Sequence, residues 1–408
     1  MHSDEMKKYS TGLLSGIFLI LLCVAGFNWL VNPYEMYSSP MLDGINIYKS
    51  EVERHTRLSK IYQVERIKPD AILLASSRGL VVEENMFAPE DMTGFNLSLT
   101  SASTYELARM FQHAQASKPL KRVVLALDES FSDDRQPGFI EERLAVNYEG
   151  TDTPGRVKQR WLDRFSSLLS RDALKASIRT IRKQGVRTAM SDEQRYMSDR
   201  VSHAGGHRQM FRTMEASIFS DYAGPDNLCV QHDDNNDAVT RPSTNYFEKI
   251  VELAYSNDID LYVYFSPAHA RLYYAKCMVG EFDRIRQMKL QVVDIVEKMA
   301  EKYGKVPFPV WDFSGYNVIT TEELPVLADT SSLMRWYWEG SHYTRQTAKL
   351  LFARMFGLTE ANQDFGVRIS GDNIEAHLEE IDRQQAAYIS SHGKDIEELN
   401  ELFNISVK

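Results

Sequence analysis

The sequence lacks the features of several specialised protein classes. It has no internal repeat and no low-complexity tract, and its 43% apolar and 25% charged residues are close to average usage. The composition therefore indicates a globular chain with a full core, in one large domain or two small ones. An excess of positive charge is also missing, since the formal net charge is −10. This balance argues against general nucleic-acid binding, because a polyanion would be repelled.

Cysteine is scarce, with three residues in the chain. Cys23 lies in an apolar run behind Leu22, where a lipoprotein signal would need a small residue, so we interpret it as a membrane-buried thiol. Cys229 and Cys277 remain. In an oxidising compartment they are a candidate disulfide. Such a bond would stabilise the folded state by roughly 4 kcal/mol, because it lowers the entropy of the unfolded chain. Two unpaired buried thiols are the alternative, because the sequence does not supply their separation.

The N-terminus contains a long apolar run, from Leu13 to Val31, without a formal charge. A helix over residues 13–31 would extend about 28 Å, close to the hydrocarbon core of a bilayer at roughly 30 Å. Lys7 and Lys8 precede the run and acidic residues follow it, so the positive-inside rule places residues 1–12 in the cytoplasm and the remainder outside. A cleaved signal peptide is the alternative, although no small-x-small site follows the run cleanly.

Beyond a linker and first helix at residues 32–68, short apolar runs alternate with amphipathic segments. We predict strands over residues 71–75, 94–98, 122–128, 261–266 and 310–313. We predict helices over residues 51–68, 103–116, 244–255, 282–303, 345–356 and 373–389. This alternation predicts βαβ units, and hence an α/β fold over residues 69–358 in which a mostly parallel sheet is covered on both faces, a three-layer α/β/α arrangement. Ligands of such sheets bind beyond the carboxyl ends of the strands.

Two segments lie outside this pattern. An Arg-rich helical insertion at about residues 132–242 interrupts it, and a helical tail follows over residues 359–408. We expect the insertion to cover the site or to bind a partner. Its basic residues between Arg156 and Arg187 are explained by solvated helix faces, which we favour, or by a surface for an anionic polymer or lipid headgroups.

Two distant motifs carry candidate chemistry. Ser77 follows the predicted strand at 71–75, so its hydroxyl should emerge at the carboxyl end of that strand. His342 lies just before the helix predicted at 345–356, and Glu339 stands three residues earlier, where its carboxylate can orient the imidazole. Nucleophilic serine chemistry requires this combination of hydroxyl, base and carboxylate. A helix N-cap is the alternative role for a serine at this position.

Two other motifs resemble metal sites only weakly. His203 and His207 have a helical ligand spacing, but two glycines between them disfavour a helix. Residues 233–237 begin like a calcium loop, yet Ala238 and Thr244 stand where its glycine and glutamate are required. We therefore expect no metal and no cofactor.

The order of the motifs resembles the SGNH/GDSL hydrolase superfamily. Residues 75–78 are similar to its nucleophile block, and Glu339-x-x-His342 is similar to its Asp-x-x-His block with Glu for Asp. Residues 96–103 are similar to the Asn-x-Ser-x-Ser-Gly-x-Thr block of periplasmic SGNH thioesterases. The resemblance implies that Ser77 is the nucleophile and that Ser77 and Ser101 donate backbone N–H groups to an oxyanion hole.

The third block of this superfamily, Gly-x-Asn-Asp, is replaced here by Asp128-Glu129-Ser130-Phe131. A carboxylate cannot donate to an oxyanion, so Ser130 or a second backbone N–H is the expected substitute. Losing one donor costs on the order of 10²- to 10³-fold in rate. Three further residues are candidates for contacting substrate: Arg78, Asn96 and His269. An ion pair with Asp70 or Glu83 is the alternative for Arg78. For His269 we favour a structural or substrate-contact role, and a second base is the alternative.

A closer resemblance is to single-pass SGNH-like proteins of bacterial envelopes, which share Asn-Pro-Tyr after the anchor, here residues 32–34, and Ser-Pro-x-His, here residues 266–269. Proteins built this way resemble the alginate O-acetylation proteins and the D-alanyl transfer protein of teichoic acid synthesis, which handle acyl groups beside a membrane-bound O-acyltransferase. The resemblance implies a bacterial inner-membrane protein whose periplasmic or extracellular domain is an esterase or O-acyltransferase for an envelope polysaccharide. A non-catalytic scaffold for the acyltransferase and a sugar receptor are the alternatives.

Overall fold

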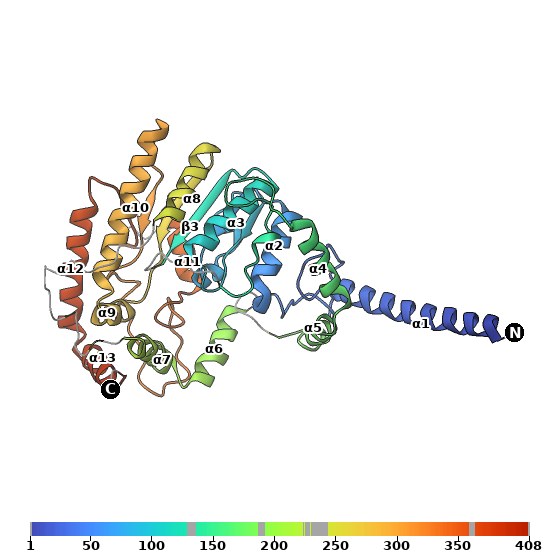
Figure 1. The fold of residues 1–408 in the computed structure, drawn as a ribbon. Coiled ribbons are helices and arrows are strands. Elements are labelled where there is room, and N and C mark those ends of the chain that lie inside the picture. The colour runs from blue at the N-terminus through green and yellow to red at the C-terminus, as the bar shows by residue number, and fades with distance from the viewer. Residues whose placement is uncertain are drawn as a thin grey trace. The chain divides into compact units, whose positions relative to one another are not determined.

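The computed structural model describes residues 2–128, 136–186, 192–222, 224, 229, 244–358 and 364–406. The chain forms two compact units, whose elements Figure 1 labels. The first unit comprises Met1–Lys68, Gln112–Lys118 and Pro137–Val186. The second comprises Pro69–Phe111, Pro119–Gln136 and Arg187–Lys408. The insertion expected at about residues 132–242 is thus divided between the two units.

The second unit is built on a six-stranded sheet in the order β2-β1-β3-β4-β5-β6. Its strands are β1 (Ala71–Leu74), β2 (Gly94–Asn96), β3 (Arg122–Leu127), β4 (Asp260–Phe265), β5 (Val310–Asp312) and β6 (Val367–Ile369). The first five run parallel and β6 runs antiparallel to β5. The prediction of an α/β fold with a mostly parallel sheet is confirmed. The sequence did not predict β6, because a three-residue strand with two exposed side chains carries no apolar pattern.

The direction in which the chain adds strands reverses at β1. The chain passes from β1 to β2 on one side and then to β3 on the other, so β1 and β3 pair directly with each other. In open parallel sheets such a reversal leaves a crevice at the carboxyl ends of the two strands. Ser77 follows β1 and Asp128 follows β3, so both lie at this end of the sheet.

The helices of the second unit include those predicted over residues 103–116, 244–255, 282–303, 345–356 and 373–389. They include most of α3 (Thr104–Ser117) and all of α6 (Glu193–Ala204), α7 (His207–Ser220), α8 (Asn245–Ser256), α9 (Ala270–Met278), α10 (Phe282–Tyr303), α11 (Arg345–Met355), α12 (Ile374–Ser391) and α13 (Gly393–Ser406). Helix α10 contacts α8, α9 and α12. Five predicted helices begin and end within two residues of the observed bounds, since each has a continuous apolar face of helical period.

The first unit contains α1 (His2–Val31), α2 (Thr56–Ile67), α4 (Arg156–Leu169) and α5 (Arg171–Arg182). Among the described residues, one helical segment, Glu5–Val31, is long and apolar enough to cross a membrane, and a signal sequence would show the same features. Helix α1 ends because Asn32 adopts a left-handed conformation with φ +49° and Pro33 cannot continue the helix. The side chain of Asn32 then accepts a hydrogen bond from the backbone of Met36 at 2.9 Å.

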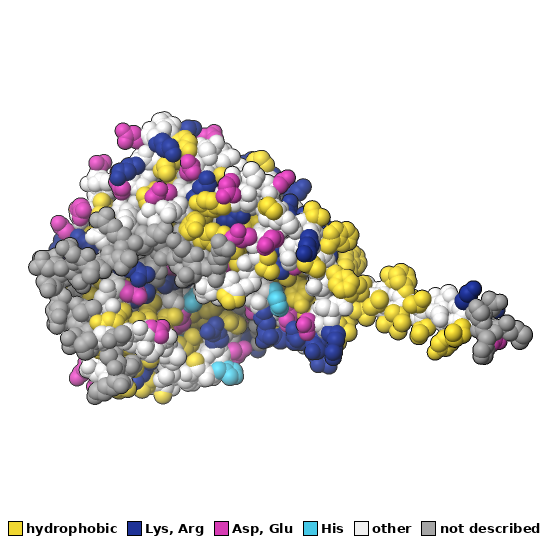
Figure 2. Space-filling model, in the orientation of Figure 1, with side chains coloured by type: hydrophobic (Ala, Val, Ile, Leu, Met, Phe, Trp, Pro, Cys, Tyr) yellow, Lys and Arg dark blue, Asp and Glu magenta, His cyan; other side chains and the backbone are white. Residues whose placement is uncertain are grey.

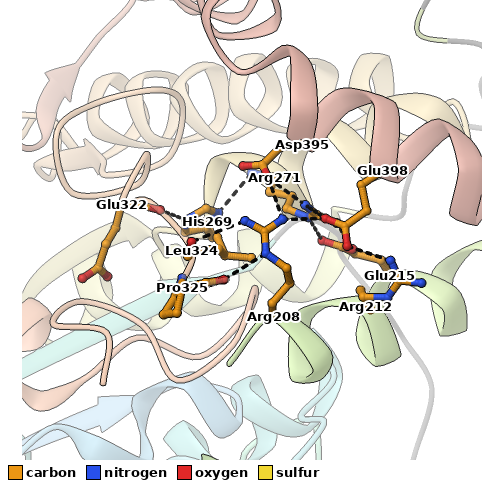
Figure 3. Close-up of polar contacts among 10 residues, drawn as sticks. All are labelled: Arg208, Arg212, Glu215, His269, Arg271, Glu322, Leu324, Pro325, Asp395 and Glu398. Carbon is orange, nitrogen blue, oxygen red and sulfur yellow. Dashed lines mark hydrogen bonds and ion pairs between the residues drawn. The ribbon is translucent and has the colours of Figure 1, made fainter. Parts of the chain in front are cut away.

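Helices α7, α9 and α13 are joined by an ionic cluster of three arginines and three carboxylates, shown in Figure 3. Arg271 at its centre is fully buried and binds both oxygens of Glu215, at 2.6 and 2.9 Å. It also contacts Glu398 at 2.7 Å and Asp395 at 3.2 Å. The three positive charges of the cluster are matched by its three negative charges, and buried charges are stable only when they are paired in this way.

We expect this cluster to make folding stability depend on pH through Glu398. Burial alone raises the pKa of Glu398, but Arg212, Arg271 and Arg208 outweigh burial and lower it to about 2. An unfolded glutamate has a pKa of about 4.3, so between these values the unfolded chain binds a proton that the folded chain does not. The stabilising contribution of Glu398 to the free energy of unfolding is therefore complete above about pH 4.5, and it is lost as the pH falls toward about 2.

Urea titrations between about pH 7 and pH 3 measure this effect. Glu398→Gln should lower the free energy of unfolding at neutral pH and flatten its decline in acid. Glu401→Gln, on the exposed side of the same helix, is the control and should follow the wild type. Identical acid profiles for Glu398→Gln and the wild type would contradict the assignment.

Candidate active site

The strand β1 ends in a tight turn that presents Ser77. A short 3-10 helix, Ser77–Val81, begins directly after the strand, and its N-cap is Ser76, whose hydroxyl accepts a hydrogen bond from the backbone N–H of Arg78 at 3.3 Å. The capping role that a serine has at such a position is thus filled by Ser76. The hydroxyl of Ser77 remains available for another contact.

That contact is His342, which comes from the other end of the sequence. His342 Nε2 lies 2.9 Å from Ser77 Oγ, and Nδ1 is hydrogen-bonded to Glu339 Oε1. With Nδ1–H donating to the carboxylate, Nε2 is left as the acceptor for the serine proton. The side chain of His342 is 35% exposed and that of Glu339 is 10% exposed, so the base is more accessible to a substrate than its partner.

Glu339 is held by several donors at once. Its oxygens accept hydrogen bonds from the backbone N–H of Ser341, the hydroxyl of Ser341 and the backbone N–H of His342, each at 3.0 Å. Burial alone raises the pKa of Glu339, but the hydrogen bonds and charge of His342, together with Ser341, lower it below the ordinary value. The carboxylate therefore stays ionised beside the imidazole, and this turn accommodates Glu in place of Asp.

The segment that carries His342 is fixed on both sides. Tyr337 and Tyr343 form an antiparallel bridge, and the backbone N–H of Trp338 donates to the carbonyl of His342 at 2.8 Å. His207 of α7 is fully buried and contacts the Trp338 carbonyl through Nδ1 at 2.9 Å. Its Nε2 accepts a hydrogen bond from a second backbone N–H of this segment at 3.1 Å. Both ring nitrogens of His207 are thus used, and burial lowers its pKa, so it serves as a neutral positioning residue rather than a metal ligand.

Asn96 supports the nucleophile turn instead of facing a substrate. Its buried Nδ2 donates to the carbonyls of Gly79 and Val82 at 2.7 and 2.8 Å. The turn is so tight that a Cβ on Gly79 would lie 2.5 Å from both Ala75 Cβ and Ser98 Oγ, which explains the glycine. The substrate-binding role predicted for Asn96 is therefore corrected to a positioning role.

Ser101 has a backbone conformation that favours glycine. Its φ is +50°, in the left-handed region that favours glycine, although the side chain is retained. Among the residues that the structure describes, its backbone N–H has no hydrogen-bond acceptor and is available to a ligand. Ser130, the other candidate donor, lies outside the described residues.

Arg78 pairs with a different carboxylate from the two expected. Its guanidinium lies 3.5 Å from Asp128, at the end of β3. Asp70 pairs with Lys121 at 3.3 Å and Glu83 pairs with Arg345 at 3.3 Å. Arg78 also lines the cavity described next, so a substrate contact for Arg78 is compatible with its position.

A cavity of about 700 Å³ opens beside the triad. Helices α6, α7 and α9 supply most of its wall, so two helices of the predicted insertion line the site as expected of a covering segment. Its lining residues are Arg78, Arg200, Ala204, Met210, Thr213, Met214, Ser217, Ile218, Leu272, Lys276, Glu339, Ser341 and His342. The wall thus combines apolar side chains with three cationic ones.

His269 lies away from this cavity, so of the two roles favoured for it the structure contains the structural one and not the substrate contact. The ring is buried, with Nε2 2.7 Å from the Glu322 carbonyl and Nδ1 accepting the backbone N–H of Arg271 at 3.2 Å. Figure 3 shows it next to the ionic cluster. Burial lowers the pKa of His269 to about 4, and with both nitrogens bound to the backbone it caps α9 and has no free atom for a substrate.

Cys229 and Cys277 form a disulfide, with their Cα atoms 4.9 Å apart, so of the two alternatives left open by the sequence the structure contains the bonded pair. Cys277 lies on α9, close in sequence to the cavity residue Lys276. Cys23 is unpaired and exposed on α1. The acidic segment at residues 233–237 lies outside the described residues.

No family model matches the chain, and no curated protein matches it. Function must therefore be argued from the geometry of the site.

Proposed function

We propose that this protein is a serine-dependent acyl esterase or O-acyltransferase of the SGNH type, acting on an acylated cell-envelope polysaccharide or another acylated envelope molecule. The observation that carries the proposal is the contact of 2.9 Å between Ser77 Oγ and His342 Nε2, with Nδ1 of the same ring on buried Glu339. A chance pairing of a serine and a histidine would not require the third, orienting group.

The proposed reaction has two steps. His342 accepts the proton of Ser77 as its oxygen attacks the acyl carbonyl, and the ester bond then breaks as the imidazolium returns that proton to the departing alcohol. The acyl-serine is attacked by water or by a sugar hydroxyl, whose proton passes through the same imidazole. Glu339 stays ionised throughout and stabilises the imidazolium. Hydrolysis and transfer differ only in the acceptor that enters the cavity.

Two backbone N–H groups are proposed to stabilise the oxyanion, those of Ser77 and Ser101. The unpartnered N–H and left-handed backbone of Ser101 support this role. Asp128 stands where SGNH enzymes place a donating asparagine, and it pairs with Arg78. Ser130 is the proposed third donor, as the sequence suggested.

The cavity wall supports an acyl ester on an anionic carrier. Met210, Met214 and Ile218 of α7 offer an apolar surface to an acyl chain. Arg200 stacks on Trp338, 5.9 Å from the ring centroid, and makes no ion pair with the described residues. Its charge is therefore available to a carboxylate or phosphate on the polymer.

The membrane setting is part of the proposal. We propose that α1 spans the inner membrane of a bacterium once, with residues 1–12 cytoplasmic and the site outside, where a membrane-bound O-acyltransferase is the proposed partner. Lys7 and Lys8 before the apolar run support this orientation. We also propose that the sheet is the middle layer of a three-layer α/β/α fold, which its buried parallel strands support.

The alternative is a non-catalytic scaffold that docks such an acyltransferase. The observation in its favour is Asp128, an acceptor where the related enzymes place a donor. Full-length protein in detergent, treated with a fluorophosphonate probe and an acetyl ester, distinguishes the two.

The wild type should be labelled and should release acetate, whereas Ser77→Ala should do neither. Ser256→Ala is the matched control, because it removes an exposed hydroxyl at the end of α8 and should still be labelled. Absence of labelling and turnover in the wild type at every pH between about 6 and 9 would favour the scaffold.

A further inference from the structure

In helix α4 of the first unit the polar and apolar faces are exchanged relative to an ordinary surface helix. Its polar side chains face the protein: Asp163 is buried and accepts hydrogen bonds from Arg143 at 2.7 Å and from Tyr62 at 2.9 Å. Two further polar residues, Arg156 and Arg160, form ion pairs with Glu65. A helix that directs its hydrogen-bonding side chains inward leaves its apolar side chains outside.

The outward face of α4 is apolar and aromatic. Val157 is 72% exposed, Trp161 67%, Leu162 50% and Phe165 65%. The spacing of four residues from Val157 to Trp161 and on to Phe165 places these three on one side of the helix. Soluble monomers rarely expose such a group of large apolar side chains, so this face requires a non-aqueous environment.

The position of α4 along α1 indicates which environment this is. Asn28, near the end of α1, donates to the Leu168 carbonyl of α4 at 2.8 Å and accepts the hydroxyl of Ser177 of α5 at 2.7 Å. About 20 residues separate Lys8 from Asn28, or about 30 Å of helix, which is the thickness of the hydrocarbon core. If Lys8 marks one face of the bilayer, α4 joins α1 at the level of the other.

The neighbouring side chains fit the boundary between lipid and water. Trp29 on α1 is 43% exposed, and Trp161 on α4 is exposed as well. Tryptophan is enriched at the boundary between lipid and water. Figure 2 shows apolar side chains along α1 and on the surface beside the end of that helix. Helix α4 also contacts α1, so its apolar face lies beside the membrane segment.

The basic residues of α4 and α5 divide into two groups. Three are paired internally, namely Arg156, Arg160 and Arg179. Exposed ones that form no ion pair with described residues are Lys158, Arg164, Arg171, Lys175 and Arg182. Exposed cations beside an apolar helix face complement the charge of anionic lipid headgroups.

We propose that α4 is a membrane-interface helix, which lies in the outer surface of the bilayer beside the end of α1 with Trp161 and Phe165 among the acyl chains and the cations at the headgroups. This inference rests on the proposed membrane anchor and not on the proposed catalysis. It would hold the first unit against the membrane, beside the membrane-bound O-acyltransferase that is the proposed partner.

Site-directed spin labelling of the full chain in lipid nanodiscs tests the proposal. In a Cys23→Ser background, single cysteines replace Phe165 or Trp161, and the control is Ser166→Cys, which is exposed on the flank of the same helix. Labels at 161 and 165 should be severalfold more accessible to oxygen than to a water-soluble nickel chelate, whereas the label at 166 should show the lower ratio of a headgroup position.

Labels at 161 and 165 that are accessible to the nickel chelate would overturn the proposal. Labels that are immobilised and accessible to neither reagent would also overturn it, because they would show that another protein or a second copy covers this face. Fluorophosphonate labelling of Ser77 in the same samples tests the catalytic proposal independently of the spin-label accessibilities, so the failure of the catalytic proposal is distinguishable from the failure of the membrane-interface proposal.

Discussion

His342→Ala and Ser77→Ala are each expected to lower kcat for an acetyl ester by about 10⁴- to 10⁶-fold. Either change removes the step in which the imidazole takes the serine proton, and the single contact at 2.9 Å offers no second route for it. Glu339→Gln should lower kcat less than either of these changes, because it removes an orienting group while the nucleophile and the base remain. KM should change little, since none of the three holds the acyl chain.

The diagnostic result is the double variant. Because the two residues act as one unit, Ser77→Ala with His342→Ala should be no slower than either single variant. Steady-state rates of the four proteins test this, with Ser256→Ala, an exposed serine at the end of α8, as the control that keeps normal turnover. If the losses multiply in the double variant, the two residues act independently, and a catalytic pair is the wrong interpretation.

Arg271→Met is expected to lower the free energy of unfolding by about 3 to 5 kcal/mol. Arg271 is fully buried and binds three carboxylates, so its removal leaves Glu215 buried without its bidentate partner. Burial already raises the pKa of Glu215, and the loss of the guanidinium removes the main opposing influence. The cluster joins α7 to α9, both of which line the cavity, so the substrate KM should rise as well.

Two control variants separate burial from charge. Arg383→Met breaks an exposed pair with Glu380 on α12 and should cost no more than about 1 kcal/mol. The double variant Arg271→Met with Glu215→Leu removes both members of the buried pair and should recover part of the loss. Urea denaturation measures all of these differences. Equal effects of Arg271→Met and Arg383→Met would contradict the central role of Arg271.

The elements that the sequence predicted well are those with a complete local pattern. The strand of residues 122–127 is a continuous apolar run, and the helix of residues 282–303 has an unbroken apolar stripe, so each period was visible without knowledge of its neighbours. The pairing of Ser77 with His342 was predictable for a related reason. In a parallel sheet the carboxyl ends of the strands share one edge, and the spacing of Glu339 and His342 marks an oriented base.

Other assignments depended on atoms that only folding brings together. His269 and Asn96 have the residue types of substrate contacts, yet the fold turns both toward backbone groups. His207 looked like half of a metal motif, and the structure uses it to hold the Trp338 carbonyl instead. The polarity of each side chain was readable from the sequence, but its partner was not, because hydrogen-bond partners lie at distances in sequence that no local pattern records.

The amino-acid sequence by itself determined the class of sheet, the apolar helix at the N-terminus and the three side chains of the candidate triad, because these depend on short-range periodicity and on the ends of strands. The tertiary structure alone decided which helices wall the cavity, that the two distant cysteines bond, and that α4 directs its apolar face outward. The physical reason is that these properties follow from the surfaces that meet when the chain folds. The spacing of apolar residues shows that a helix has an apolar face, but it does not show whether that face will be buried.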